Sequence, residues 1–188
     1  MAETPPETAL SLQLPQVASA RHAPAREHLE GEVVALFDQL RAPLLGYLLT
    51  LGLPIQDGEE IVQEAFLALF EHLRRGRPRD NLRGWMFRVA HNLGLKRASK
   101  LKSFRPASEQ LLVLDPAPGP EEQAADQQRL KNLTAVVRAM PEQDRRCLWL
   151  RAEGLRYREI ADVLGMSLGA VAMSLARSLG RLARVAER

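Results

Sequence analysis

Four carboxylates lie close together in the first half of the chain, at a spacing that can bind a divalent metal ion. Oxygen ligands of this kind support metal-dependent hydrolysis, including cleavage of nucleic acids. One hypothesis is therefore a nuclease that uses Asp57, Glu59, Glu60 and Glu64. The cluster has no paired histidine and no recognisable phosphate-binding glycine loop, and His72 and His91 lie far apart with no cysteine partner. We therefore expect neither a metal site nor a cofactor.

Positive charge is concentrated in one block of the chain. Residues 71–105 contain eleven lysines and arginines against two acids, although the formal net charge of the whole chain is only +3. The next block, residues 107–128, has five acids and no base. This segregation indicates two surfaces with different partners, and the basic block suits the phosphates of a nucleic acid. The alternative is a solvated helix face, which is what most charge runs are.

The C-terminal part of the chain has the pattern of a helix-turn-helix. Ala161, Gly165 and Val171 lie four and then six residues apart. Alanine lets two helices approach, glycine can adopt the left-handed conformation of the turn, and Val171 can anchor the second helix. Ser167 is predicted to cap that helix, and its predicted inward face is Leu168, Val171, Leu175, Leu179 and Leu182. A plain helical hairpin in a protein-interaction module would show the same stripe.

The apolar spacing predicts an all-α protein, because helical periodicity recurs and strand alternation is nowhere sustained. Helical patterning begins near Glu30, and Pro43 is predicted to start a new segment or to kink the helix. A second helix is predicted from Asp57, which would cap it, with Glu60 completing a capping box. Asn81 is predicted to cap a third helix, which contains the basic residues.

The predicted architecture is two small helical domains joined by a flexible acidic linker. Residues 1–28, with four prolines, are predicted to be a disordered extension. The first domain covers residues 29–103 and the second, with the helix-turn-helix, covers residues 121–188. Residues 104–120 form the linker, which is rich in proline and acids.

The sequence predicts a cytoplasmic protein. The longest apolar stretch, PLLGYLLTLGL, is interrupted by Gly46 and Thr50 and is shorter than the roughly 20 residues that span a bilayer, so no membrane span is expected. The N-terminus lacks the pattern of a secretory signal. Cys147 is the single cysteine, which excludes an intrachain disulfide, and its apolar neighbours predict a buried thiol.

Two motifs, in this order, resemble bacterial sigma factors. GEEIVQEAF (58–66) and LRGWMFRVAHN (82–92) resemble their conserved region 2, and GLRYREIADVLGMSLGAVAMSL (154–175) resembles their region 4. The order, and a linker without an intervening domain, resemble the extracytoplasmic-function group of the sigma-70 family, over residues 31–186. The resemblance implies a transcription initiation factor without enzymatic chemistry. Such a factor binds core RNA polymerase and directs promoter recognition and opening.

The resemblance also assigns candidate residues to the first domain. Contacts with the polymerase clamp are carried over to Glu60, Ile61, Gln63 and Glu64. The basic loop and the helix after it correspond to the part that reads the melted minus-10 element, where a single strand needs a basic groove and an unstacked base needs a polar pocket. The candidates there are Asn81, Arg83, Arg88, Asn92, Lys96 and Arg97. For Trp85, a role in the core is favoured over base stacking.

In the second domain the resemblance assigns the minus-35 element to Ser167, Ala170, Ala172, Met173, Arg177 and Arg181. The family commonly has Thr, Lys and Arg where this chain has Ala170, Ala172 and Ser174, so direct hydrogen-bond readout should be reduced. Ala172 and Met173 can touch a thymine methyl group, Arg177 can reach a phosphate or a guanine edge, and Arg181 can hold the backbone.

Other partners and functions remain open at this point. An anti-sigma factor is a further candidate partner, and in the family the acidic linker threads toward the RNA path of the polymerase, with a simple tether as the alternative. The second hypothesis is a conventional helix-turn-helix regulator, which acts without being a polymerase subunit. Such a regulator would need a ligand-sensing or receiver domain, and neither predicted unit is large enough to contain one.

Overall fold

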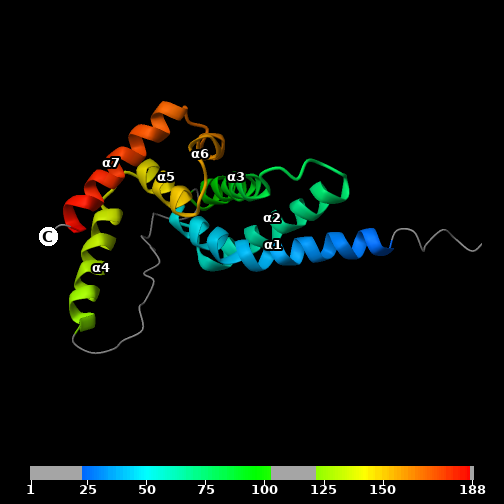
Figure 1. Ribbon diagram of the computed structural model, residues 1–188, viewed down its shortest axis with the longest axis horizontal. Coiled ribbons are helices and arrows are strands. Elements are labelled where there is room, and N and C mark those ends of the chain that lie inside the picture. Colours follow the sequence, from blue (N-terminus) through cyan, green and yellow to red (C-terminus); the bar gives the residue numbers. More distant parts are fainter. Residues whose placement is uncertain (1–22, 103–121, 187–188) are drawn as a thin grey trace, which may run out of the picture.

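The computed structural model describes residues 23–102 and 122–186, and every regular element in these ranges is a helix (Figure 1). This confirms the predicted all-α fold for the described part of the chain. The predicted linker and most of the predicted N-terminal extension lie outside these residues. The helices are α1 (Ala23–Thr50), α2 (Ile55–Arg74), α3 (Leu82–Lys102), α4 (Glu122–Arg138), α5 (Glu142–Ala152), α6 (Tyr157–Leu164) and α7 (Leu168–Ala186).

The helix α1 is a single element that contains Pro43. The prediction of a new segment at this proline is therefore wrong, and α1 also begins earlier than Glu30. A proline inside a helix removes one backbone hydrogen bond. Leu40 and Leu44 lie on either side of it and are at most 1% exposed, and their burial offsets the lost bond.

Part of α1, Leu29–Thr50, is long and apolar enough to cross a membrane by length and composition alone. The core helix of a soluble protein meets the same criterion. In α1 the side chains of Leu44, Tyr47 and Leu48 are fully buried against the other helices. These residues account for part of the apolar character of the segment, of which 28% is buried inside the structure.

The start of α2 differs from the prediction. The helix begins at Ile55, with Pro54 at the N-cap and no side-chain cap. The predicted capping box that begins at Asp57 is therefore wrong. Proline suits a position just ahead of a helix because it has no backbone N–H to leave unpaired, and the carbonyl of Pro54 accepts the first helical hydrogen bond from Gly58 at 3.0 Å. Asp57 instead forms an ion pair with Arg97 of α3.

The two helical units share one continuous core. In Figure 1, α1 and α2 lie side by side, α6 lies over α3, and α4 lies along the end of α7. α5 also contacts α1, where Trp149 approaches the backbone at Gly46. A Cβ atom at Gly46 would lie 2.8 Å from Cζ2 of Trp149, so only glycine permits this approach. Cys147 is fully buried in this core, as predicted.

A buried tyrosine–histidine pair joins α1 to α3. The hydroxyl of Tyr47 lies 2.7 Å from Nδ1 of His91, whose side chain is 4% exposed. Burial, together with the positive charge of Arg146, lowers the pKa of His91 to about 4. Burial also raises the pKa of Tyr47 well above its ordinary value. The histidine is therefore neutral in the folded protein near neutral pH.

The low pKa of His91 predicts a loss of stability in mild acid. Between pH 6.5 and about 4 the unfolded chain binds a proton that the folded chain excludes, so the free energy of unfolding should fall as the pH falls. The slope from this group is at most about 1.4 kcal/mol per pH unit. Denaturant titrations across this range should show a shallower slope for His91→Gln, which keeps an acceptor for Tyr47. Identical slopes would contradict this assignment.

Candidate nucleic-acid interface

The helices α6 and α7 form a helix-turn-helix. Their axes are bent by 106°, within the roughly 90–120° of DNA-binding examples. Gly165 ends α6 with φ 63°, the left-handed conformation that was predicted. The Oγ of Ser167 accepts a hydrogen bond from the Ala170 N–H at 3.2 Å and so caps α7, and Val171 is fully buried. The sequence pattern therefore identified this motif correctly.

The inward face of α7 differs from the predicted leucine stripe. Leu168 and Leu179 are each 52% exposed, whereas Ser174 and Ser178 are fully buried. The buried stripe therefore contains two serines between its apolar residues. Both hydroxyls have partners: Ser178 Oγ donates to the Ser174 carbonyl at 2.9 Å, and Ser174 Oγ donates to a carboxylate of α5. Ser174 therefore faces α5 and does not offer its side chain to a DNA groove.

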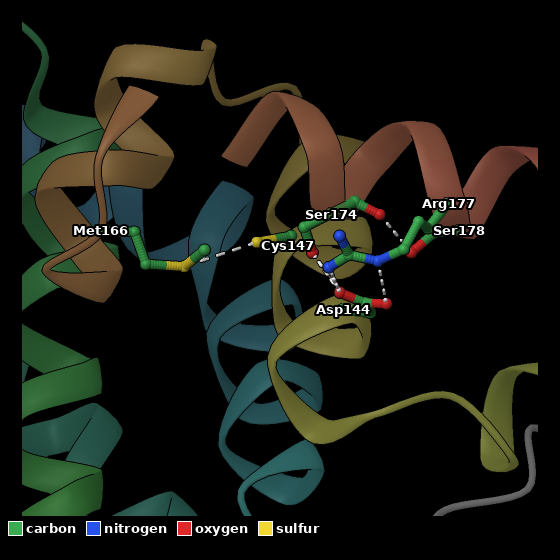
Figure 2. A network of polar contacts seen from close by, with 6 residues as sticks. All are labelled: Asp144, Cys147, Met166, Ser174, Arg177 and Ser178. Atoms are coloured by element: carbon green, nitrogen blue, oxygen red, sulfur yellow. Dashed lines mark hydrogen bonds and ion pairs between the residues drawn. The ribbon is translucent and has the colours of Figure 1, made fainter. Parts of the chain in front are cut away.

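That carboxylate belongs to Asp144, which forms the centre of a polar network between α5 and α7 (Figure 2). Its side chain is 2% exposed and accepts hydrogen bonds from Ser174 Oγ at 2.6 Å and from Arg177 Nη2 at 2.8 Å and Nε at 3.3 Å. The bonds from Arg177 hold the pKa of Asp144 below its ordinary value, against the effect of burial. The predicted DNA contact Arg177 is thus an ion-pair partner whose side chain is half exposed.

The remaining minus-35 candidates lie on or beside the outer surface of α7. Ser167, Ala170 and Met173 are exposed, and Ala172 and Arg181 are half-buried. Met173 is 62% exposed, and the exposed Leu168 is a neighbour that the sequence pattern had assigned to the core. This surface is therefore largely apolar, with arginines along one side.

Three of the minus-10 candidates form one exposed row on α3. Arg88, Asn92 and Lys96 are spaced by four residues, which places them on the same helix face, and all three are exposed. Leu95 lies beside this row and is 40% exposed. The sequence pattern did not identify Leu95, although its position three residues after Asn92 could have indicated it.

The other three minus-10 candidates have partners within the chain. Asn81 has φ 56° and caps α3, as predicted, through its Oδ1, which accepts from the Gly84 N–H at 3.1 Å. Arg83 donates from Nε to the carbonyl of Glu153 at 2.8 Å and from Nη2 to its carboxylate at 3.0 Å. Arg97 forms ion pairs with Asp57 and Glu60 of α2. Intramolecular contacts therefore use both arginines.

The outer face of α2 is acidic and contains an apolar residue. Glu60, Gln63 and Glu64 are exposed, and Leu67, on the same face, is 68% exposed. Ile61 is 1% exposed and packs in the core. The side chain of Ile61 is therefore not available for the predicted contact. Leu67 is available instead, and the sequence pattern missed it because it lies outside the buried stripe.

The candidate metal ligands have other roles in the structure. Asp57 and Glu60 are paired with Arg97. His72 packs on Trp85 with ring centroids 4.6 Å apart, and its Nε2 lies 2.8 Å from the carbonyl oxygen of Pro78. Within residues 23–102 and 122–186, no group of three His, Cys, Asp or Glu side chains is arranged to hold a metal ion.

A helix-turn-helix in one unit and an exposed basic row in the other are typical of DNA-binding proteins, and comparison with known proteins identifies the class of this one. Residues 36–104 match the family described as Sigma-70 region 2, and residues 130–182 match Sigma-70, region 4. The matches cover more than half of the chain, which therefore belongs to the sigma-70 family, as a sigma factor of the extracytoplasmic-function type. Such a protein binds core RNA polymerase and promoter DNA, directs transcription initiation and is not an enzyme.

Curated relatives support this assignment. The chain is 30% identical over 141 residues to the RNA polymerase sigma factor CnrH of Cupriavidus metallidurans, an alignment that covers 70% of this chain and 74% of CnrH. It is 28% identical over 130 residues to the ECF RNA polymerase sigma factor SigE of Mycolicibacterium smegmatis, which covers 67% of this chain and 50% of SigE.

Two solved structures share the fold. One is CnrH in complex with the cytosolic domain of CnrY, with a TM-score of 0.52 and 23% identity, covering 88% of this chain and 94% of that one. The other is the sigma factor RpoE in complex with the anti-sigma factor NepR from Bartonella quintana, with a TM-score of 0.60 and 18% identity, covering 86% and 98%.

The contact between the two units should be easy to disturb. It includes a half-buried ion pair, Arg83–Glu153, and ion pairs near the protein surface are typically worth about 1 kcal/mol or less. The buried Nε1 of Trp149 has no hydrogen-bond partner among the described residues, which costs about 1–3 kcal/mol. A small change at this contact should therefore shift the chain toward separated units.

Gly46→Ala is the variant that tests this expectation. The new methyl group would lie 2.8 Å from Trp149, whereas alanine favours the helix α1 itself by roughly 1 kcal/mol. We expect a larger radius of gyration by small-angle X-ray scattering, with the helix content unchanged. Gly31→Ala is the matched control, because it lies in the same helix with nothing within 4 Å. An unchanged radius for Gly46→Ala would show that the contact tolerates the methyl group.

Proposed function

We propose that this sigma factor uses three separate surfaces: α2 for core polymerase, α3 for the minus-10 element and α7 for the minus-35 element. The observation that carries the proposal is the exposed row of Arg88, Asn92 and Lys96. Two cations flank an amide on one helix face, and each can donate hydrogen bonds to phosphates or to an unpaired base. The charge of the two cations is free for DNA because neither has an ion pair within the described residues.

The outer face of α2 is the proposed contact with polymerase. Exposed Leu67 supplies an apolar centre, and Glu60, Gln63 and Glu64 supply a polar surround. Protein interfaces commonly have this arrangement, with an apolar centre inside a polar rim. A hollow of about 180 Å³ between α1 and α2, with Gln63 in its lining, extends the same surface.

The proposed minus-35 surface is the outer side of α7, with Ala170, Ala172 and Met173 toward the groove and Arg181 near the backbone. Leu168 adds to its apolar area. Contacts with thymine methyl groups and with the shape of the duplex suit such a surface better than a dense set of hydrogen bonds. Ser167 has its hydroxyl oxygen in the cap of α7 and can still donate to a phosphate.

We also propose that this sigma factor acts in the cytoplasm and is held inactive by an anti-sigma factor. The structures of CnrH and RpoE that resemble it are complexes with CnrY and NepR. We expect the full chain to co-purify with an anti-sigma protein from its own cell. When transcription is induced, the anti-sigma protein should release the chain. The same promoters should be active in the absence of that partner.

The test of the whole proposal is transcription by purified components. Core polymerase mixed with the full chain should initiate at a defined set of promoters, which sequencing of the transcripts identifies. Leu67→Asp should reduce assembly with core polymerase, whereas Val34→Asp, at an apolar position of α1 that is also exposed (59%, against 68% for Leu67), should not. Specific DNA binding that needs no polymerase, with no stimulated transcripts, would instead favour the conventional regulator.

A further inference from the structure

The contact between Asp144 and Arg177 fixes the direction of the arginine. Two nitrogens of one planar guanidinium bind the same carboxylate, at 2.8 and 3.3 Å. Because the group is rigid and planar, occupying one edge sets the direction of the rest. In Figure 2 the third nitrogen of Arg177 lies on the side away from Asp144. Half of the arginine side chain is exposed (50%), so a ligand can reach it.

The position of Asp144 is itself held by its surroundings. Ser174 donates to the same oxygen that accepts from Arg177 Nη2. Cys147 is fully buried one turn further along α5, where its Sγ lies 3.9 Å from Sδ of Met166. Arg181 of α7 adds a positive charge toward Asp144. A carboxylate that is buried and bonded in this way cannot rotate to follow a mobile arginine.

The ion pair also changes which DNA groups Arg177 suits. The strength of a phosphate contact and its salt dependence come mainly from the positive charge that the protein brings to the DNA backbone. The negative charge of Asp144 cancels much of the positive charge of Arg177, whereas the N–H donors of Arg177 keep their direction. Directed donors are what the N7 and O6 acceptors of guanine require in the major groove.

We propose that Asp144 is a positioning residue that makes Arg177 a reader of a guanine edge in the minus-35 element, and not a phosphate contact. This inference rests on the proposed role of α7. It resolves the alternative between phosphate and guanine that the sequence left open for Arg177. It also gives this apolar recognition helix one directed polar contact with the bases.

The first test measures base preference with the holoenzyme. Transcription from a saturation library of the minus-35 element should show one or two positions where guanine is preferred. Asp144→Asn should reduce that preference at least about fivefold, the low end of what a bidentate contact discriminates. Glu142→Gln is the matched control, because it neutralises an exposed carboxylate of the same helix and should keep the preference.

The second test separates a base contact from a phosphate contact. Arg177→Lys keeps the charge but cannot present the same planar pair of donors. It should lose the guanine preference and leave the salt dependence of promoter binding nearly unchanged. Arg181→Ala, our proposed backbone contact, should do the reverse, lowering the slope by about 0.9 for one phosphate on duplex DNA. Asp144→Asn added to Arg177→Lys should cause no further change in preference.

Clear results would overturn the inference. A guanine preference that survives both Asp144→Asn and Arg177→Lys would contradict it. A uniform loss of transcription at all promoter positions would also contradict it, because that result indicates a purely structural role for Asp144. If Asp144→Asn fails to fold, Ser174→Ala, which keeps the carboxylate charge, must weaken the same preference for the inference to stand. If the wild-type holoenzyme transcribes from specific promoters but shows no dependence on the minus-35 sequence, the inference about Asp144 is refuted and the proposed function stands. If the chain does not stimulate transcription at all, the proposed function is refuted.

Discussion

The free chain should bind a duplex promoter at least about 100-fold more weakly than the holoenzyme does at the same salt concentration. The structure gives two reasons. Each proposed DNA-binding surface lies on a single helix, and in the free chain the two units pack together, with Arg83 bound to Glu153. Polymerase would hold both units at the promoter spacing, so that the second contact forms at a high effective concentration once the first is made.

Fluorescence anisotropy with a labelled promoter duplex measures this difference directly. A duplex that keeps only the minus-35 element is the control, and the advantage of the holoenzyme over the free chain should shrink on it. Gly46→Ala should bind the full promoter no more than slightly better than the wild-type free chain, because opening the contact does not set the spacing. Equal affinities of free chain and holoenzyme for the full promoter would refute this account.

Replacing Arg88 and Lys96 together with alanine should strongly impair promoter opening. Both side chains are exposed on the same face of α3, and both are proposed to contact the melted strand. Each lost phosphate contact should reduce the slope of log binding constant against log salt by about 0.7, the value for single-stranded DNA. Permanganate reactivity of the unpaired thymines reports opening, and co-elution with core polymerase reports assembly.

The matched control for this pair is Lys131→Ala with Arg138→Ala. These two cations are exposed on α4, so the variant has the same loss of net charge without a change to α3. It should open promoters as the wild type does, apart from a small general effect of charge. Normal opening by the Arg88 and Lys96 variant would show that the α3 row is a solvated surface, and weak assembly with core polymerase would place the defect outside DNA.

Local sequence signals predicted the elements of this protein and its motif. The turn at Gly165, the cap at Ser167, the anchor at Val171 and the cap at Asn81 each depend on residues within one or two helical turns. Such features are decided by backbone conformation and by hydrogen bonds to nearby amides, which the sequence shows directly. The family followed from two motifs in their order, and the comparisons confirm it.

Only the tertiary structure decided which polar side chains are available to a partner. Arg83, Arg97 and Arg177 all appear in the sequence as cations suited to DNA, but their carboxylate partners lie 70, 37 and 33 residues away. Pairing over such distances depends on how the helices pack, and helical periodicity does not encode it. The same reason explains the buried Ser174, because its hydroxyl donates to Asp144, a carboxylate that the packing of another helix brings to it.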